Sequence, residues 1–269
     1  MLIDQKFTFT SSEQAKMREL RERVLNCSKL EIGTEEVFLS KFLYFTHWDV
    51  AKAFESICKY YDFKHEHPAW MAQHSVEYFR SHFLDLKAKF VMPQPDREGR
   101  MIIILKIVDG FDKYPNYLRD VVEMDDLIFE SMLLLPTVQK NGISIIYDLS
   151  GITKNFLRML SPQFSRLINA KGQIIPFTNR VVHLIQKGFL MNATSALVMP
   201  FMSKEIKEHI ITHDGKNFDK MRDMLGYENL PAEYGGPAKN VLDANLLYDH
   251  MLQHSDYLLK LQSYRKCAQ

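Results

Sequence analysis

The chain has 269 residues and a mass of 31.6 kDa, enough for one large domain or two modest ones with a substantial hydrophobic core. Apolar residues make up 46% of it and charged residues 25%, which excludes an intrinsically disordered chain. The 34 Lys and Arg nearly balance the 33 Asp and Glu, and a net charge of +1 argues against a nucleic-acid partner.

The sequence shows neither a segment that could span a bilayer nor the pattern of a signal peptide. The longest apolar run, Met101 to Val108, is interrupted by Lys106 and is too short for a bilayer span. Asp4 and Lys6 occupy the region where a signal peptide needs an apolar stretch. Three scattered cysteines are too few for a disulfide framework or a zinc site. We therefore expect a cytoplasmic protein without a metal or cofactor.

The first ninety residues have a helical pattern. Thr10 and Glu13 have the spacing of a capping box, and an apolar segment follows at Val37–Phe45. Asp49 is placed to cap a helix with an apolar stripe. That stripe consists of Val50, Ala53, Phe54, Ile57, Cys58 and Tyr61. Another helix is expected around Phe79, so we predict an N-terminal helical domain over residues 1–92.

The period of the pattern changes at Gly99. Runs rich in β-branched residues predict strands at Arg100–Val108, Ile143–Leu149, Val181–Gln186 and His209–His213. Helices are expected at Tyr117–Leu135, Asn155–Ala170 and Ser203–Glu208. Apolar strands alternating with helices indicate an α/β fold with a mainly parallel sheet. We assign the sheet domain to residues 93–240 and a C-terminal helical tail to 241–269.

An α/β sheet is typical of many enzymes, but the catalytic motifs are missing. The sequence has no G-x-G-x-x-G after a strand, no P-loop and no nucleophile elbow. His65-Glu66-His67 lacks a third metal ligand nearby, and Cys58 lies on an apolar stripe. An isomerase or hydrolase would need a nucleophile–base pair that the sequence does not offer. We predict that the protein is not an enzyme.

Five motifs in order resemble those of the CRAL-TRIO lipid-binding family. One is Leu230–Gly236, which reads LPAEYGG, and it is the five in this order, not any single one, that are specific for the family. The others are Phe42-Leu43 with Asp49–Ala53 and Tyr60-Tyr61, Asn141-Gly142 with Tyr147–Gly151, Pro176–Arg180, and Met199–Phe201 with Ile206–Glu208. The resemblance extends from about Ser12 to Gly236. Within the family, the sequence is similar to the tocopherol- and retinaldehyde-binding branch.

The resemblance implies a helical bundle packed on a domain whose sheet forms the floor of a lipid cavity. The residues expected to bind the ligand are Phe129, Leu133, Ile143, Ile145, Tyr147, Leu160, Phe164, Ile168, Ile175, Phe177, Val182 and Leu184. An amphipathic gate helix is expected to cover the cavity and to open at membranes, and the apolar run from Phe189 to Met202 fits it. Its residues are Phe189, Leu190, Met191, Thr194, Leu197 and Val198.

The implied function is non-catalytic binding of a tocopherol- or retinoid-like molecule and its transfer between membranes. The protein would be a monomer that contacts membranes transiently. The alternative is a phospholipid- or phosphoinositide-binding sensor or regulator. Extraction of the bound lipid separates the two, because a carrier should hold a prenol-like or retinoid species and a sensor a phosphatidyl lipid.

A basic cleft that grips a phosphoinositide in this family is only partly present. Arg180 matches the pattern, whereas Thr178 and Glu205 stand where lysines are expected. The candidate phosphoinositide-binding residues are Arg180, Lys204, Lys207 and His209. A solvated charged face is the alternative interpretation of these lysines.

Asp125 interrupts the apolar face of the helix expected at Tyr117–Leu135. A carboxylate in such a place is costly unless something pairs with it. We hypothesise that Asp125 accepts a hydrogen bond from a ligand hydroxyl. The alternative is that it is solvated or caps the helix.

Overall fold

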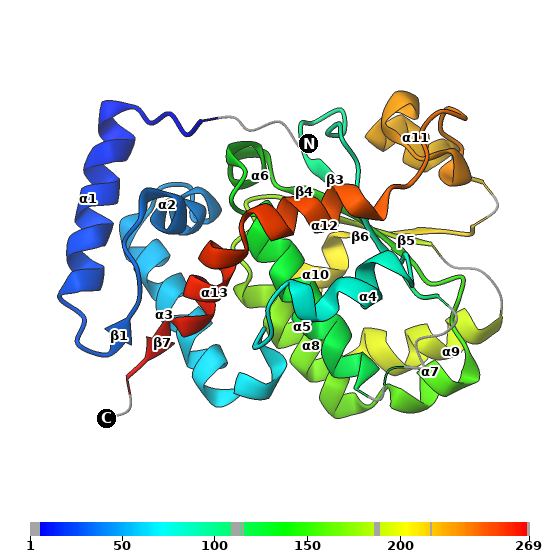
Figure 1. The fold of residues 1–269 in the computed structure, drawn as a ribbon, viewed down its shortest axis with the longest axis horizontal. Coiled ribbons are helices and arrows are strands. Elements are labelled where there is room, and N and C mark those ends of the chain that lie inside the picture. The colour runs from blue at the N-terminus through cyan, green and yellow to red at the C-terminus, as the bar shows by residue number, and fades with distance from the viewer. Residues whose placement is uncertain (1–5, 109–113, 115, 186–188, 216, 268–269) are drawn as a thin grey trace.

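A five-stranded sheet forms the centre of the structure, a computed structural model that describes residues 6–108, 114, 116–185, 189–215 and 217–267 (Figure 1). Its strands are β2 (Lys89–Val91), β3 (Met101–Lys106), β4 (Ile143–Asp148), β5 (Arg180–Ile185) and β6 (Ile210–His213), in that spatial order. Strands β3 to β6 are parallel, and β2 pairs antiparallel with β3. The mainly parallel sheet expected from the sequence is confirmed.

Helices precede the sheet in the chain. They are α1 (Ser11–Leu25), α2 (Glu36–Phe45), α3 (Val50–Glu66), the 3-10 turns η1 (Pro68–Trp70) and η2 (Glu77–Phe79), and α4 (Arg80–Leu84). The predicted caps are present, because Thr10 and Glu13 form a reciprocal capping box and Asp49 accepts from the Lys52 N–H. Burial of the α1 residues Met17 and Leu20 against α2 and α3 holds this bundle together.

The remaining helices surround the sheet. They are α5 (Tyr117–Met132), α6 (Pro136–Asn141), α7 (Lys154–Met159), α8 (Pro162–Ile174), α9 (Phe189–Val198), η4 (Met199–Phe201), α10 (Lys204–Glu208), α11 (Asp219–Leu225), η5 (Tyr227–Asn229) and η6 (Ala232–Tyr234). The expected helix at 155–170 is two helices, because Ser161 caps α8 and Pro162 occupies its first turn. The expected helix at 117–135 ends earlier, and α6 begins at Pro136.

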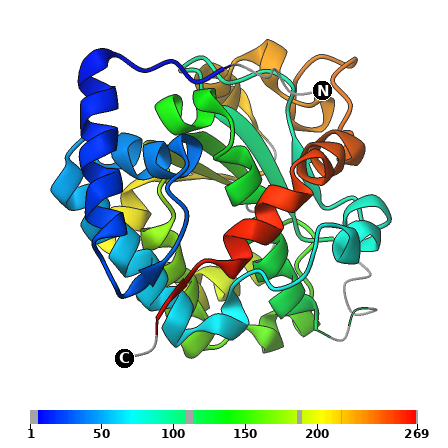
Figure 2. The same cartoon turned by 60° about the vertical axis from the view of Figure 1, so that its left-hand side comes forward.

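The C-terminal segment returns to the N-terminal helices (Figure 2). It consists of α12 (Ala244–Gln253), α13 (Ser255–Ser263) and β7 (Arg265–Lys266), and β7 pairs antiparallel with β1 (Leu30–Glu31). Lys64 of α3 donates to three carbonyl oxygens of this segment. Segments 1–92 and 241–269 of the proposed division are therefore in direct contact. Strand β2 lies within the first segment but belongs to the sheet, so this part is not purely helical.

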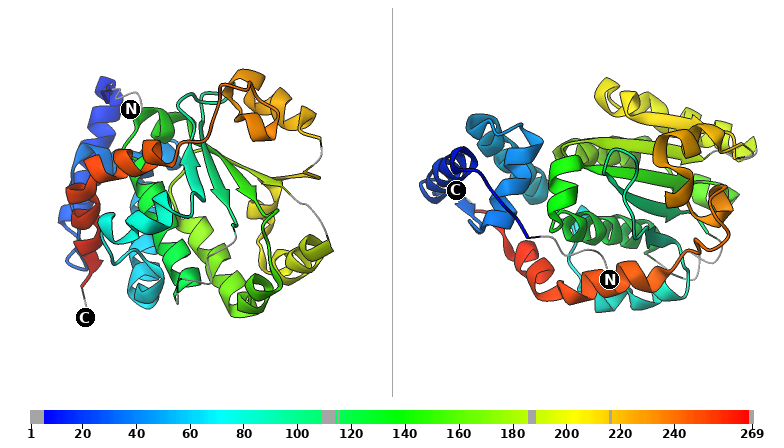
Figure 3. Two further views of the ribbon diagram at one scale, coloured as in Figure 1. Left: turned by 45° about the vertical axis from the view of Figure 1, so that its right-hand side comes forward. Right: turned by 90° about the horizontal axis from the view of Figure 1, so that it is seen from above.

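Alternation along the strands gives the sheet two buried faces. Ile103 and Ile145 face α5 and the N-terminal helices, whereas Ile104 and Ile146 pack against Met221 of α11. Figure 3 shows α11 on the opposite side of the strands from α5 and α8. The first face is the one that the cavity described below occupies.

The LPAEYGG segment covers the second face of the sheet. The Tyr234 hydroxyl donates to the Asp148 carboxylate at 2.8 Å, and Lys106 forms an ion pair with Glu233 at 2.8 Å. A Cβ on Gly236 would lie 2.0 Å from the Leu230 carbonyl oxygen, so only glycine fits there. The motif thus ties the segment after α11 to the ends of β3 and β4.

The second face also carries a buried polar cluster. The Asp96 carboxylate accepts from Arg100 at 2.8 Å and from Ser144 at 2.6 Å. The rings of His183 on β5 and His213 on β6 stack, with His183 Nδ1 and His213 Nε2 3.0 Å apart. Both rings are buried, so protonation of this pair is unfavourable in the folded state.

Candidate ligand-binding cavity

A cavity of about 320 Å³ lies between the first face of the sheet and the helices α5, α7, α8, α9 and α10. Strand β4 contributes Ile145 and Tyr147, and β5 contributes Val182 and Leu184. These residues share a face because side chains alternate along each strand, and β4 and β5 are in register. The result is an apolar floor of branched side chains.

Ten of the twelve residues predicted to bind the ligand line this cavity. They are Phe129, Ile145, Tyr147, Leu160, Phe164, Ile168, Ile175, Phe177, Val182 and Leu184. The other two, Leu133 and Ile143, do not line it but are fully buried in the main hydrophobic core. Leu133 follows the last turn of α5 and Ile143 begins β4, so both lie beyond the end of the cavity. Contact of the ten with a ligand stays a prediction.

The structure adds lining residues that the sequence did not single out as ligand-binding. They are Ile107, Leu118, Val121, Val122, Asp126, Leu149, Phe156, Ser165, Lys171, Gly172, Ser195, Met199, Met202, Ile206 and Ile210. Some of them carried a sequence signal of another kind: Leu118, Val121 and Val122 share the apolar helix face with Asp125, and Met199 and Met202 belong to the apolar run of the expected gate. The rest come from elements whose mutual packing no local pattern predicts.

Asp125 lines the cavity and is paired. Its Oδ1 accepts from Lys89 Nζ at 2.6 Å, and the side chain of Lys89 is only 5% exposed. The partner comes from β2, which the sequence did not predict to be a strand. The carboxylate is therefore neither solvated nor an N-cap, and its contact with a ligand hydroxyl stays a hypothesis.

A second buried ion pair forms part of the wall. Lys171 of α8 lies 2.8 Å from the carboxylate of Asp126, which also accepts the Ala72 N–H at 2.9 Å. Lys171 donates as well to the carbonyl oxygens of Trp70 and Val122. Burial raises the pKa of Asp126 to about 6 against the opposing effect of Lys171. The pair links α5, α8 and η1 across the inner end of the wall.

Arg180 begins β5 and points into the same cavity. Its Nη1 donates to the Gly172 carbonyl oxygen at 2.7 Å, and burial lowers the pKa of its guanidinium. The other three candidate phosphoinositide residues, Lys204, Lys207 and His209, are exposed on or beside α10. Arg180 thus lines the cavity and is partly buried, whereas the other three are exposed, and a shared phosphoinositide site stays a prediction.

The expected gate helix corresponds to α9, which continues into η4. Thr194, Ser195 and Val198 line the cavity, while Leu197 faces outward and is 39% exposed. The backbone of Phe189, Leu190 and Met191 is helical, but their side chains lie outside the described part of the structure. Ser165 of α8 donates to the Leu197 carbonyl oxygen at 3.5 Å, a weak tie to the wall.

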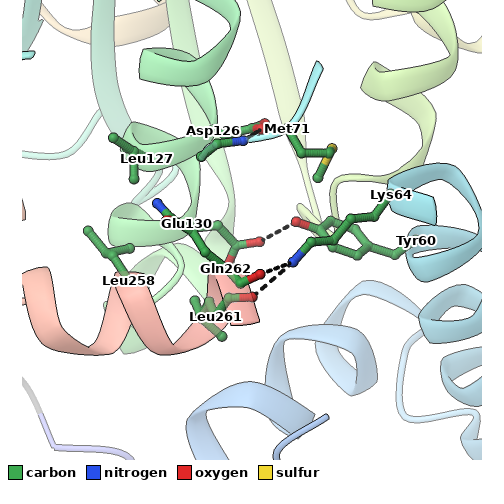
Figure 4. Close-up of a pocket in the computed structure, with 10 residues that line it drawn as sticks. Tyr60, Lys64, Met71, Asp126, Leu127, Glu130, Leu258, Leu261 and Gln262 are labelled. Atoms are coloured by element: carbon green, nitrogen blue, oxygen red, sulfur yellow. Dashed lines mark hydrogen bonds between the residues drawn. The ribbon is translucent and has the colours of Figure 1, made fainter. Parts of the chain in front are cut away.

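A second, much smaller pocket of about 30 Å³ lies behind Asp126 (Figure 4). It has room for a water molecule or two and no more. Figure 4 shows Lys64 donating to the carbonyl oxygens of Leu261 and Gln262, and Tyr60 donating to Glu130. The Lys64 bonds fasten α13 to α3 and the Tyr60 bond fastens α5 to α3, so we assign this pocket a structural role.

Comparison with known proteins identifies the family. The family model for the CRAL/TRIO domain matches residues 86–236, more than half of the chain. The chain belongs to the CRAL/TRIO domain family. The match begins at residue 86, earlier than the start of the sheet domain expected at residue 93, because it includes strand β2. Membership in this family supports binding and transfer of a hydrophobic ligand.

The CRAL/TRIO chain is similar to the Clavesins. Clavesin-2 from Homo sapiens is 24% identical over 233 residues, which cover 82% of this chain and 68% of that protein. Clavesin-1 from Mus musculus is 23% identical over 233 residues, covering 82% of this chain and 62% of that protein. The expected tocopherol- and retinaldehyde-binding branch stays a prediction.

A solved structure supports the CRAL/TRIO fold. The crystal structure of Sfh5 matches with a TM-score of 0.51 and 13% sequence identity, over 94% of this chain and 100% of that one. Within the described ranges, no helix is long and apolar enough to cross a bilayer. The described residues also hold no group of three or more metal-ligating side chains close enough to bind an ion.

Proposed function

We propose that this protein binds a hydrophobic small molecule of the tocopherol or retinoid kind and transfers it between membranes without changing it chemically. The observation that carries the proposal is the cavity of about 320 Å³ with its floor of Ile145, Val182 and Leu184. Cavities for small ligands have volumes of about 300–1,000 Å³ and mostly apolar walls. This cavity lies at the lower end, which favours a single-chain ligand over a diacyl phospholipid.

The energetics of such binding are favourable. A ligand with about 400 Å² of apolar surface gains about 10 kcal/mol on burial, at ~25 cal/mol per Å². Association and ordering remove several kcal/mol of this gain. The remainder corresponds to a Kd in the nanomolar to micromolar range. A protein that acts this way works in the cytoplasm, needs no cofactor and visits membranes transiently.

Release requires an opening, and α9 is the element we assign to it. Its inner side lines the cavity through Thr194 and Val198, so displacing it exposes both helix and ligand. A membrane interface lowers the free energy of that open state, because the apolar side of the helix enters lipid instead of water. Leu197 is already exposed and is placed to make the first contact.

Leu197→Asp should weaken binding to lipid vesicles and slow the transfer of retinol between donor and acceptor vesicles, while the fold stays intact. A charge in place of an exposed leucine opposes entry into the interface but disturbs no core packing. Sedimentation with vesicles and a transfer assay measure the two effects. The matched control is Leu259→Asp on α13, where the leucine is 43% exposed and distant from α9 in sequence and fold. Equal sedimentation of Leu197→Asp and the control would exclude α9 as the docking element.

Lys204 and Lys207 lie on α10, directly after the gate segment, and both are exposed. We infer that these two lysines favour binding to anionic membranes. Their exposure supports this part of the phosphoinositide hypothesis. Replacing both with alanine should reduce binding to vesicles that contain phosphatidylserine or a phosphoinositide, by about 1 kcal/mol for each lysine. Binding to neutral vesicles should not change. If the double variant binds all vesicles like wild type, the two lysines are merely solvated.

A further inference from the structure

One cation that lines the cavity, Arg180, has no acidic partner among the described residues. Lys89 is paired with Asp125 at 2.6 Å and Lys171 with Asp126 at 2.8 Å. Arg180 also lines the cavity, but no carboxylate oxygen of the described residues lies within 4.0 Å of its guanidinium. Of the charged side chains that line the cavity, Arg180 is therefore the one without an oppositely charged partner in the described part of the chain.

Arg180 has hydrogen-bonding capacity to spare. A guanidinium offers five N–H donors, and among the described residues only the Gly172 carbonyl oxygen accepts from it, at 2.7 Å. A partly buried cation without a counter-ion is costly, and burial lowers the pKa of this guanidinium. A carboxylate matches the fork of donors that remains.

A second donor faces the same space from the neighbouring strand. Tyr147 lines the cavity on β4, and its hydroxyl has no recorded hydrogen-bond partner within the described part of the chain. Burial and then Asp125 raise the pKa of this phenol, whereas Arg180 lowers it. The phenol therefore stays protonated and able to donate. Tyr147 and the remaining N–H groups of Arg180 are thus donors without an acceptor among the described residues, in a mostly apolar cavity.

The position of Arg180 determines how a ligand would lie. It begins β5, and Val182 and Leu184 follow on the same face of the strand. Its guanidinium lies near Gly172 of α8, which in turn is close to Ile206 of α10. An anionic head at Arg180 leaves the remaining apolar length of the cavity for a tail that extends along β5 toward Leu149 and Leu160.

We propose that the ligand is a hydrophobic monocarboxylate, a single apolar chain or ring system whose carboxylate pairs with Arg180 while its tail occupies the cavity. This proposal rests on the proposed function and specifies its ligand class. One monoanion would be the counter-ion that Arg180 lacks among the described residues, and a single chain suits the volume of about 320 Å³. Neutral tocopherol or retinol would leave Arg180 without a counter-ion.

Two matched pairs of probes test the proposal, namely oleate with oleyl alcohol and retinoic acid with retinol. Affinities are measured by fluorescence titration of wild type, Arg180→Met and Arg180→Lys. We expect wild type to prefer each acid over its alcohol. Arg180→Met should lose at least about 10-fold in affinity for both acids, the effect of one charged hydrogen-bonded pair, with little change for the alcohols. Arg180→Lys keeps the charge and should retain part of the preference.

The control is Arg158→Met, the same substitution at an exposed position of α7, which should bind all four probes like wild type. Equal losses for acids and alcohols in Arg180→Met, or no acid preference in wild type, would overturn the proposal and leave the proposed function standing. Extraction of phosphatidylinositol from vesicles in an Arg180-dependent manner, without oleate binding, would overturn it in favour of a lipid phosphate. Failure of wild type to bind any of the four probes would instead contradict the proposed function itself.

Discussion

Lys171→Met is expected to lower the free energy of unfolding by about 3–5 kcal/mol, because it leaves the carboxylate of Asp126 buried without its counter-ion. The two side chains are each only 7% exposed and lie 2.8 Å apart. Lys171 also donates to the carbonyl oxygens of Trp70 and Val122, which lose a donor at the same time. Urea denaturation followed by circular dichroism measures the loss.

A double variant separates the charge effect from lost packing. Asp126→Asn removes the stranded charge, so Lys171→Met/Asp126→Asn should regain much of the stability that the single variant lost. The surface control is Lys59→Met, whose pair with Glu55 is 66% and 61% exposed and should contribute less than about 1 kcal/mol. A loss in Lys171→Met no larger than in this control would mean that the ion pair does not hold the cavity wall together.

The protein is expected to lose stability in mild acid through His183. Burial and then the neighbouring His213 lower the pKa of His183 to about 3, from an ordinary value near 6.5. The unfolded chain therefore binds a proton that the folded state does not, and this contribution to stability is complete above pH 6.5. It is lost as the pH falls from 6.5 toward 3, at about 1.4 kcal/mol per pH unit. Burial lowers the pKa of His213 as well, in the same direction.

His183→Gln isolates this effect. The variant should be closer to wild type in stability at pH 4.5 than at pH 7, with a relative gain of about 2–3 kcal/mol over that interval. Asp126 acts in the opposite direction, because its pKa is raised and its contribution to stability is therefore lost as the pH rises. The difference between wild type and variant cancels this contribution and those of the other acids. His209→Gln is the control, because His209 is exposed. Parallel pH profiles for wild type and His183→Gln would contradict the assigned burial of the pair.

The sequence predicted the elements well wherever local chemistry specifies them. The capping box at Thr10 and the cap at Asp49 are where the pattern placed them. The parallel strands follow the runs of β-branched residues to within a few positions. Strand β2 was missed because three residues are too few to reveal the alternation typical of a strand. It forms by pairing with β3, which lies further along the chain and which local patterns do not report.

The cavity was predicted through a resemblance and not through local patterns. Ten of twelve expected residues line it, since alternation along β4 and β5 fixes which side chains share a face. The ion pairs could not be predicted, because Lys89 and Lys171 come from elements far from α5 in the sequence. Arg180 was assigned to a surface cleft, and only the packing of α8 beside β5 places its guanidinium inside.

Organic extraction of the protein purified from cells, followed by mass spectrometry, tests the central claim most directly. The account predicts one dominant hydrophobic species of single-chain or prenoid type in near-stoichiometric amount. It also predicts loss of that species from Ile168→Trp, which fills the cavity from α8. Unchanged thermal unfolding would show that this variant still folds. A diacyl phospholipid as the main species would favour the sensor, and equal ligand content in wild type and Ile168→Trp would contradict the cavity as the binding site.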